Sequence, residues 1–115
     1  SSIYLPFLVK ALEKLITKNV LGIYNLCSPN YMSKYEFAIQ LTEEFNLDGK
    51  YIKKGFLSNN FKLVKRPLNM SMSNQKLTKK INFKIPKLQK QISIMKKDLN
   101  KDYHLFMKKL KIVKK

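Results

Sequence analysis

The chain has 115 residues, of which 24 are Lys or Arg and seven are Asp or Glu, so its formal net charge is +17. A hydrophobic content of 44% is that of a globular protein with one modest core and excludes an intrinsically disordered chain. No apolar run approaches the roughly 18 residues that span a bilayer, the N-terminus lacks the pattern of a signal peptide, and the single cysteine excludes an internal disulfide. We therefore expect a cytoplasmic protein.

The positive charge has two interpretations. The stretch from Gly49 to Lys97 contains no Asp or Glu, which is typical of a surface for nucleic acid or another anionic polymer. However, Arg66 is the only arginine, and the abundance of Lys, Asn and Ile is what A/T-rich codons produce. Nucleic-acid readers depend on arginine for paired contacts, so we favour solvated lysine faces and do not expect nucleic acid as the partner.

Two amphipathic helices are predicted in the first half of the chain. The first runs from Tyr4 to Lys18, with Pro6 in its first turn. The second begins at a capping box formed by Ser33 and Glu36 and runs to about Asn46. The first helix should bury one face, made of Leu5, Leu8, Val9, Leu12, Leu15 and Ile16.

Short strands are predicted between and after these helices. Gly22–Leu26 is rich in strand formers and ends at a turn, Tyr51–Lys54 gives a second short strand, and residues 61–65 alternate as an approach strand would. Cys27 follows the first strand and has no histidine or acidic cluster nearby in the sequence. A small, half-buried thiol is therefore favoured over a nucleophile or a metal ligand.

The stretch after residue 65 combines an arginine, a proline and a helix start. Pro67 favours an extended backbone at Arg66 and stiffens the backbone at the residue that carries the guanidinium. Ser73 is the predicted N-cap of a short helix over residues 74–80.

Pro86 opens a last element, in which apolar residues recur at helical spacing. The element is either a helix that covers the domain, unbroken or divided near residues 100–102, or the seam of a coiled coil through which two copies form a homodimer. The apolar residues are Leu88, Ile92, Met95, Leu99, Tyr103, Phe106 and Leu110.

The sequence contains no complete active site. Three glycines cannot form a glycine-rich nucleotide motif, and His104 is the only histidine, so neither a metal cluster nor a Ser-His-Asp set is expected. Glu43 and Glu44 would point about 100° apart on a helix, which favours solvated surface over an acid–base pair.

An ordered set of motifs resembles a known family. An apolar helix ends at Leu15-Ile16, and there follow Gly22–Leu26, Ser33–Ala38, and the loop Arg66–Ser71 with Lys76-Leu77 after it. In this order the set resembles the C-terminal part of extended short-chain dehydrogenase/reductases, most closely dTDP-4-dehydrorhamnose reductases, over residues 1–90.

This resemblance implies an α/β fold, the small C-terminal substrate lobe of a Rossmann-type enzyme, with helices, a few short strands and a long C-terminal helix. It makes residues 1–100 the substrate-binding lobe and residues 101–115 a lysine-rich helical tail. In the family, an arginine of the Arg-Pro loop helps to bind the diphosphate of the nucleotide-sugar substrate. The implied substrate-binding residues are therefore Arg66, with Asn69 and Ser71 as polar groups of the same loop.

The resemblance also implies that the chemistry lies outside this chain. The family's glycine-rich domain, which binds NADPH or NADH, and its catalytic Tyr-x-x-x-Lys have no counterpart here, so no catalytic, cofactor-binding or metal-binding residue is expected and the chain should be inactive alone. Met70 and Met72 depart from the family's loop pattern.

The implied function is to bind the sugar nucleotide for an NAD(P)-dependent reductase or epimerase that acts on a dTDP-4-keto sugar. The alternatives are a basic nucleic-acid-binding module and a non-catalytic relative that regulates a partner enzyme.

Overall fold

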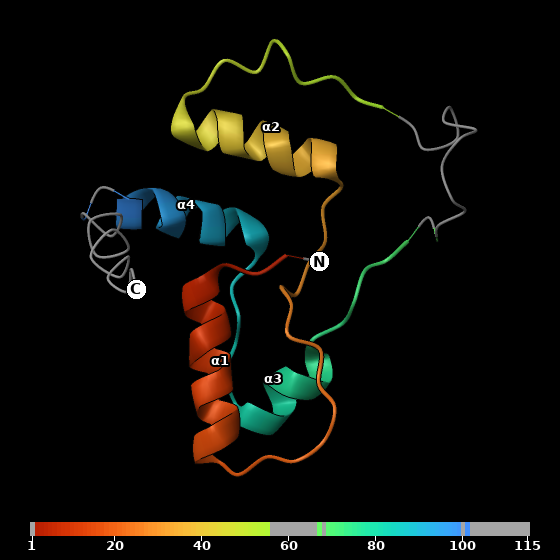
Figure 1. The fold of residues 1–115 in the computed structure, drawn as a ribbon, viewed down its shortest axis with the longest axis vertical. Helices are drawn as coiled ribbons and strands as arrows, with labels where there is room; N and C mark the ends of the chain where they lie inside the picture. The colour runs from red at the N-terminus through yellow and green to blue at the C-terminus, as the bar shows by residue number, and fades with distance from the viewer. Residues whose placement is uncertain (1, 56–66, 68, 100, 102–115) are drawn as a thin grey trace, which may run out of the picture.

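The computed structural model describes residues 2–55, 67, 69–99 and 101. This part contains four helices, α1 (Leu5–Thr17), α2 (Lys34–Phe45), α3 (Gln75–Ile81) and α4 (Leu88–Leu99). Helix α1 packs against α3 and helix α2 packs against α4, and in the view of Figure 1 the α2–α4 pair lies above the α1–α3 pair.

Helix α1 begins and ends within one residue of its prediction, and Pro6 stands in its first turn, where its missing N–H costs little. Its inner side carries Ala11, which is completely buried. Ala11 forms the core together with three residues of α3 and the segment after it, Leu77, Ile81 and Ile85. This cluster lies between α1 and α3, and α4 separately buries Leu88 and Ile92.

This packing covers only part of the apolar face that was predicted to be buried on α1. Leu8 and Leu15 are half-buried, and Leu15 lies against the core. Because only α3 among the described helices packs against α1, the other side of the face has no cover and the prediction is wrong there. Four side chains at helical spacing, exposed between 41% and 77%, form what we call the α1 stripe: Leu5, Val9, Leu12 and Ile16.

Helix α2 begins at the predicted capping box. The Glu36 N–H donates to Ser33 Oγ at 3.1 Å, and the Ser33 N–H donates to Glu36 Oε2 at 2.7 Å. The helix ends at Phe45, and the cap residue Asn46 has a positive φ of 53°, so the chain leaves the helix in the left-handed conformation that Asn tolerates. The side chains predicted for its inner face are half-buried rather than buried: Phe37, Ala38, Leu41 and Phe45.

The predicted α/β fold is wrong, because the described residues form helices and no strand. A β-ladder needs the backbone N–H and C=O groups of a second extended segment. Beside residues 22–27 the neighbouring groups are side chains instead: Lys76 Nζ donates to the Ile23 carbonyl at 3.1 Å, and Asn74 Nδ2 donates to the Cys27 carbonyl at 2.8 Å. Residues 52–55 also lack a partner strand within the described chain, and the expected strand over 61–65 lies outside the described residues.

Helices α3 and α4 begin with help from polar side chains. Helix α3 starts one residue later than predicted, so Asn74 stands at its cap position, but the predicted cap Ser73 accepts a hydrogen bond from the Gln75 N–H through its Oγ at 3.3 Å. The first N–H of α4, that of Leu88, donates to Asn30 Oδ1 at 2.9 Å, so a side chain 58 residues away caps this helix. Helix α4 ends at Leu99, and the predicted tail, from residue 102 on, lies outside the described residues.

None of the described helices is both long enough and apolar enough to cross a membrane.

Candidate functional site

The predicted substrate-binding residues belong to one loop, of which the structure describes the second part. Arg66 lies outside the described residues, whereas Asn69 and Ser71 are exposed. Asn69 Oδ1 accepts a hydrogen bond from the Ser71 N–H at 2.9 Å, which makes an Asx turn. Asn69 and Ser71 are thus brought together, and one role of Asn69 is to shape the loop backbone.

The end of this loop is fastened to the segment after α1. Asn25 Nδ2 donates to the Ser73 carbonyl at 3.2 Å, and Cys27 Sγ donates to the Met72 carbonyl at 3.4 Å. With the bond from Asn74 to the Cys27 carbonyl, these contacts join parts of the chain that are 45 to 48 residues apart. These hydrogen bonds therefore hold the C-terminal end of the loop, residues 72–74, against the segment that follows α1.

Cys27 is fully buried, not half-buried as predicted. Burial raises the pKa of its thiol above the ordinary value of 9.0, because the thiolate would lose its hydration. The thiol therefore stays protonated near neutral pH and donates to the Met72 carbonyl. This environment suits a structural residue and not a nucleophile.

A buried polar network connects α1, the turn at Ser28 and α4. Gln91 is 2% exposed, and its Nε2 donates to Ser28 Oγ at 2.8 Å and to the Pro86 carbonyl at 2.6 Å. Its Oε1 accepts from the Tyr4 N–H at 2.7 Å. Sequence reasoning missed Gln91, although its position three residues after Leu88 puts it beside the apolar stripe of α4. Among the described residues no buried side-chain nitrogen or oxygen lacks a partner, so the network is structural.

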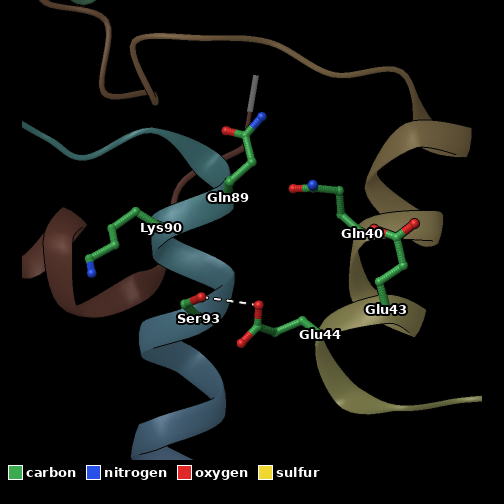
Figure 2. Close-up of a pocket in the computed structure, with 6 residues that line it drawn as sticks. All are labelled: Gln40, Glu43, Glu44, Gln89, Lys90 and Ser93. Atoms are coloured by element: carbon green, nitrogen blue, oxygen red, sulfur yellow. Dashed lines mark hydrogen bonds between the residues drawn. The ribbon is translucent and has the colours of Figure 1, made fainter.

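A cavity of about 500 Å³ lies between α2 and α4 and has only polar side chains in its lining (Figure 2). Glu44 accepts a hydrogen bond from Ser93 Oγ at 3.0 Å across the two helices, while Gln40 extends from α2 toward α4 over the gap. The described residues contain no group of three or more metal-ligating side chains. Glu44 is half-buried rather than solvated, and its hydrogen bond holds the two helices together, so we assign this cavity to helix packing.

A second cavity, of about 540 Å³, lies between α3 and the chain that connects α3 to α4. Its walls are almost entirely apolar, and the first turn of α3 completes it. No sequence pattern indicates this cavity, since the residues that form it are scattered along the chain. Among the residues that line it are Pro29, Ile85, Pro86, Lys79, Lys84 and Lys87.

No family model matches the chain, and neither does any curated protein or solved structure that was compared with it. The resemblance to reductases consequently depends on the residue motifs alone.

Proposed function

We propose that this chain is the sugar-nucleotide-binding portion of an NAD(P)-dependent reductase or epimerase that acts on a dTDP-4-keto sugar, similar to dTDP-4-dehydrorhamnose reductases. The supporting observation is that two of the motifs behind the resemblance meet in space. Lys76 Nζ donates to the Ile23 carbonyl at 3.1 Å, and Asn25 Nδ2 donates to the Ser73 carbonyl between the loop and Lys76.

The proposed ligand group for the diphosphate is the guanidinium of Arg66. A planar guanidinium forms paired hydrogen bonds with phosphate oxygens, and each charge-assisted bond contributes about 1.5–3 kcal/mol. Asn69 and Ser71 support this role as exposed polar groups of the same loop, and the Asx turn between them limits the conformations of the loop before a ligand arrives.

The reduction itself requires NADPH or NADH, which supplies the hydride when bound. The residues of this chain do not fit that cofactor, because its three glycines, Gly22, Gly49 and Gly55, are too far apart to form a glycine-rich phosphate loop. In the proposed function the cofactor therefore binds to a domain outside these 115 residues, the chain alone is inactive, and the complete enzyme works in the cytoplasm.

The test is a titration of the ¹⁵N-labelled chain with dTDP-glucose, followed by NMR. We expect saturable chemical-shift changes in residues 66–73, and we expect Arg66→Ala to abolish them. Lys65→Ala is the matched control, since it removes a neighbouring positive charge and should leave binding nearly unchanged.

Two results would contradict the proposal. One is the absence of any saturable change at the loop, and the other is an equal loss of affinity in the Arg66 and Lys65 variants. Tight binding of duplex or single-stranded DNA that weakens steeply with salt would instead support the nucleic-acid alternative.

A further inference from the structure

The cavity beside α3 offers a ligand almost nothing but apolar surface. Pro29 and Pro86 contribute their rings, and Ile85, which is 2% exposed and belongs to the core, is a third apolar lining residue. The exposed lysines of the lining, such as Lys84, contribute mainly their aliphatic stems, because so little of the lining is polar. Water in this cavity finds few hydrogen-bond partners, so its replacement by an apolar group is favourable.

Hydrogen bonds between distant segments hold the cavity in shape. Asn74 Nδ2, at the start of α3, donates to the Cys27 carbonyl at 2.8 Å. The Leu88 N–H, at the start of α4, donates to Asn30 Oδ1 at 2.9 Å. Residues 27–30, which include Pro29, are thus bonded to both helix starts that border the cavity. The cavity is therefore formed before a ligand arrives, which lowers the conformational cost of binding.

The size and the surroundings of the cavity favour a small uncharged compound. Its volume of about 540 Å³ lies within the range of small-molecule pockets, roughly 300–1,000 Å³. A charged group inside it would lose its hydration without gaining a polar partner. A protein interface would continue the apolar surface beyond the cavity. However, none of the exposed large apolar residues in the described chain lies between residues 73 and 98.

From these observations we infer that the cavity beside α3 binds a small uncharged compound with an apolar ring system. The inference does not depend on the proposed function, because it uses neither Arg66 nor the loop of Asn69 and Ser71.

The experiment compares two probes on the whole ¹⁵N-labelled chain by NMR. The probes are 2-naphthol and 2-naphthoate, which share the same pair of rings and differ in charge. We expect 2-naphthol to cause saturable chemical-shift changes in residues 27–30 and 74–87. At these residues 2-naphthoate should bind at least about fivefold more weakly, because its carboxylate must give up water to reach apolar walls.

Two protein variants test whether the rings occupy this cavity. Thr78 of α3 is part of the lining, and Thr78→Phe should fill the space and weaken 2-naphthol binding by at least about fivefold. Thr17→Phe makes the same change at an exposed position on α1 and should alter binding by less than about twofold. Pro29→Ala removes part of one wall at an exposed position and should weaken binding by at least about twofold. Circular dichroism checks that the helices persist in all three variants.

Each of the other outcomes overturns the inference. Absence of saturable shifts with 2-naphthol would show that the cavity takes no such ligand. Equal or tighter binding of 2-naphthoate would mean that the positive charge of the chain attracts the probe. Shifts concentrated in residues 5–16 would place the rings on the α1 stripe instead. Unchanged affinity in folded Thr78→Phe and Pro29→Ala would place the rings outside this cavity.

Discussion

The start of α2 depends on a pair of side chains, of which Ser33 provides the N-cap. Replacement of Ser33 by Ala removes the acceptor for the Glu36 N–H, and such caps stabilise helices by about 1 kcal/mol. We expect the free energy of unfolding to fall by about this amount for Ser33→Ala. Ser33→Thr keeps an acceptor oxygen and should lose less, which urea denaturation can measure.

The same pair makes a pH-dependent contribution. The Ser33 backbone N–H, and then its side chain, lower the pKa of the Glu36 carboxyl below its ordinary value of 4.5. Because the folded-state pKa is lowered, the stabilisation is complete above the unfolded pKa and is lost as the pH falls through the folded value. NMR titration should show the Glu36 pKa below 4.5 in the natural chain and nearer to it in Ser33→Ala, and an unchanged pKa would contradict this assignment.

Gln91 is the residue on which the junction of α1 and α4 depends. Gln91→Leu would leave the Tyr4 N–H, the Pro86 carbonyl and the Ser28 hydroxyl each without one of its hydrogen bonds. The Ser28 hydroxyl keeps its bond to the Ser2 carbonyl, so the change removes three hydrogen bonds without leaving every group unpartnered, and we expect the free energy of unfolding to fall by about 1–3 kcal/mol.

Gln75→Leu is the control for Gln91→Leu, because Gln75 is exposed on α3 and undergoes the same chemical change. Its effect should stay within about 0.5 kcal/mol. Similar losses in the two variants would show that the buried network contributes little.

At the scale of elements, α1 offers an internal comparison between its two faces. Val9 belongs to the exposed α1 stripe, whereas Ala11 is fully buried in the core. We expect Val9→Gln to change the free energy of unfolding by about 0.5 kcal/mol or less. Ala11→Gln should cost at least about 1–3 kcal/mol, because it forces a longer polar side chain into a packed core.

Thermal and urea unfolding of these two α1 variants measure the difference between the faces. A loss for Val9→Gln as large as that for Ala11→Gln would mean that the stripe is covered in solution. The control is helical content, which should be the same in both variants because Gln is a good helix former.

The helices could be predicted from the sequence because their signals are local. The Ser33–Glu36 box, Pro6 and the apolar spacing of α1 each act within a few residues, and all three features stand in the structure. The prediction of strands was wrong because residues such as Ile23 have strand propensity, but no second strand pairs with them among the described residues. Propensity for an extended backbone does not create the second segment that a sheet needs.

The candidate sites could be predicted only in part, for a related reason. The proximity of Asn69 and Ser71 follows from the sequence, but the bonds from Asn25 and Cys27 to the loop span more than 40 residues. The cavity beside α3 requires Pro29 to lie near α3 and the chain after it, which no local pattern indicates. Long-range proximity of this kind depends on how the helices pack.

At the scale of the whole molecule, the excess of positive charge affects the stability of the folded state. The formal net charge is +17, and Lys50–Asp48 is the ion pair found among the described residues, at 2.8 Å on the surface. A chain with so large an excess of positive charge is destabilised in its compact state by self-repulsion. We therefore expect stability to rise as salt screens the lysines, with the screening length falling from about 10 Å at 0.1 M to about 3 Å at 1 M.

Urea denaturation at increasing sodium chloride concentration measures this effect, and two triple variants of exposed lysines show where the repulsion is concentrated. They are Lys79→Gln, Lys84→Gln, Lys87→Gln and Lys10→Gln, Lys34→Gln, Lys97→Gln. Each triple lowers the formal net charge by three, from +17 to +14, so uniform repulsion predicts the same reduced salt dependence for both. Because Lys79, Lys84 and Lys87 line one cavity, we expect their replacement to raise stability at low salt more than the Lys10, Lys34 and Lys97 replacement does. Stability that falls with salt in the natural chain, or equal gains in the two triples, would show that these three lysines do not repel one another appreciably.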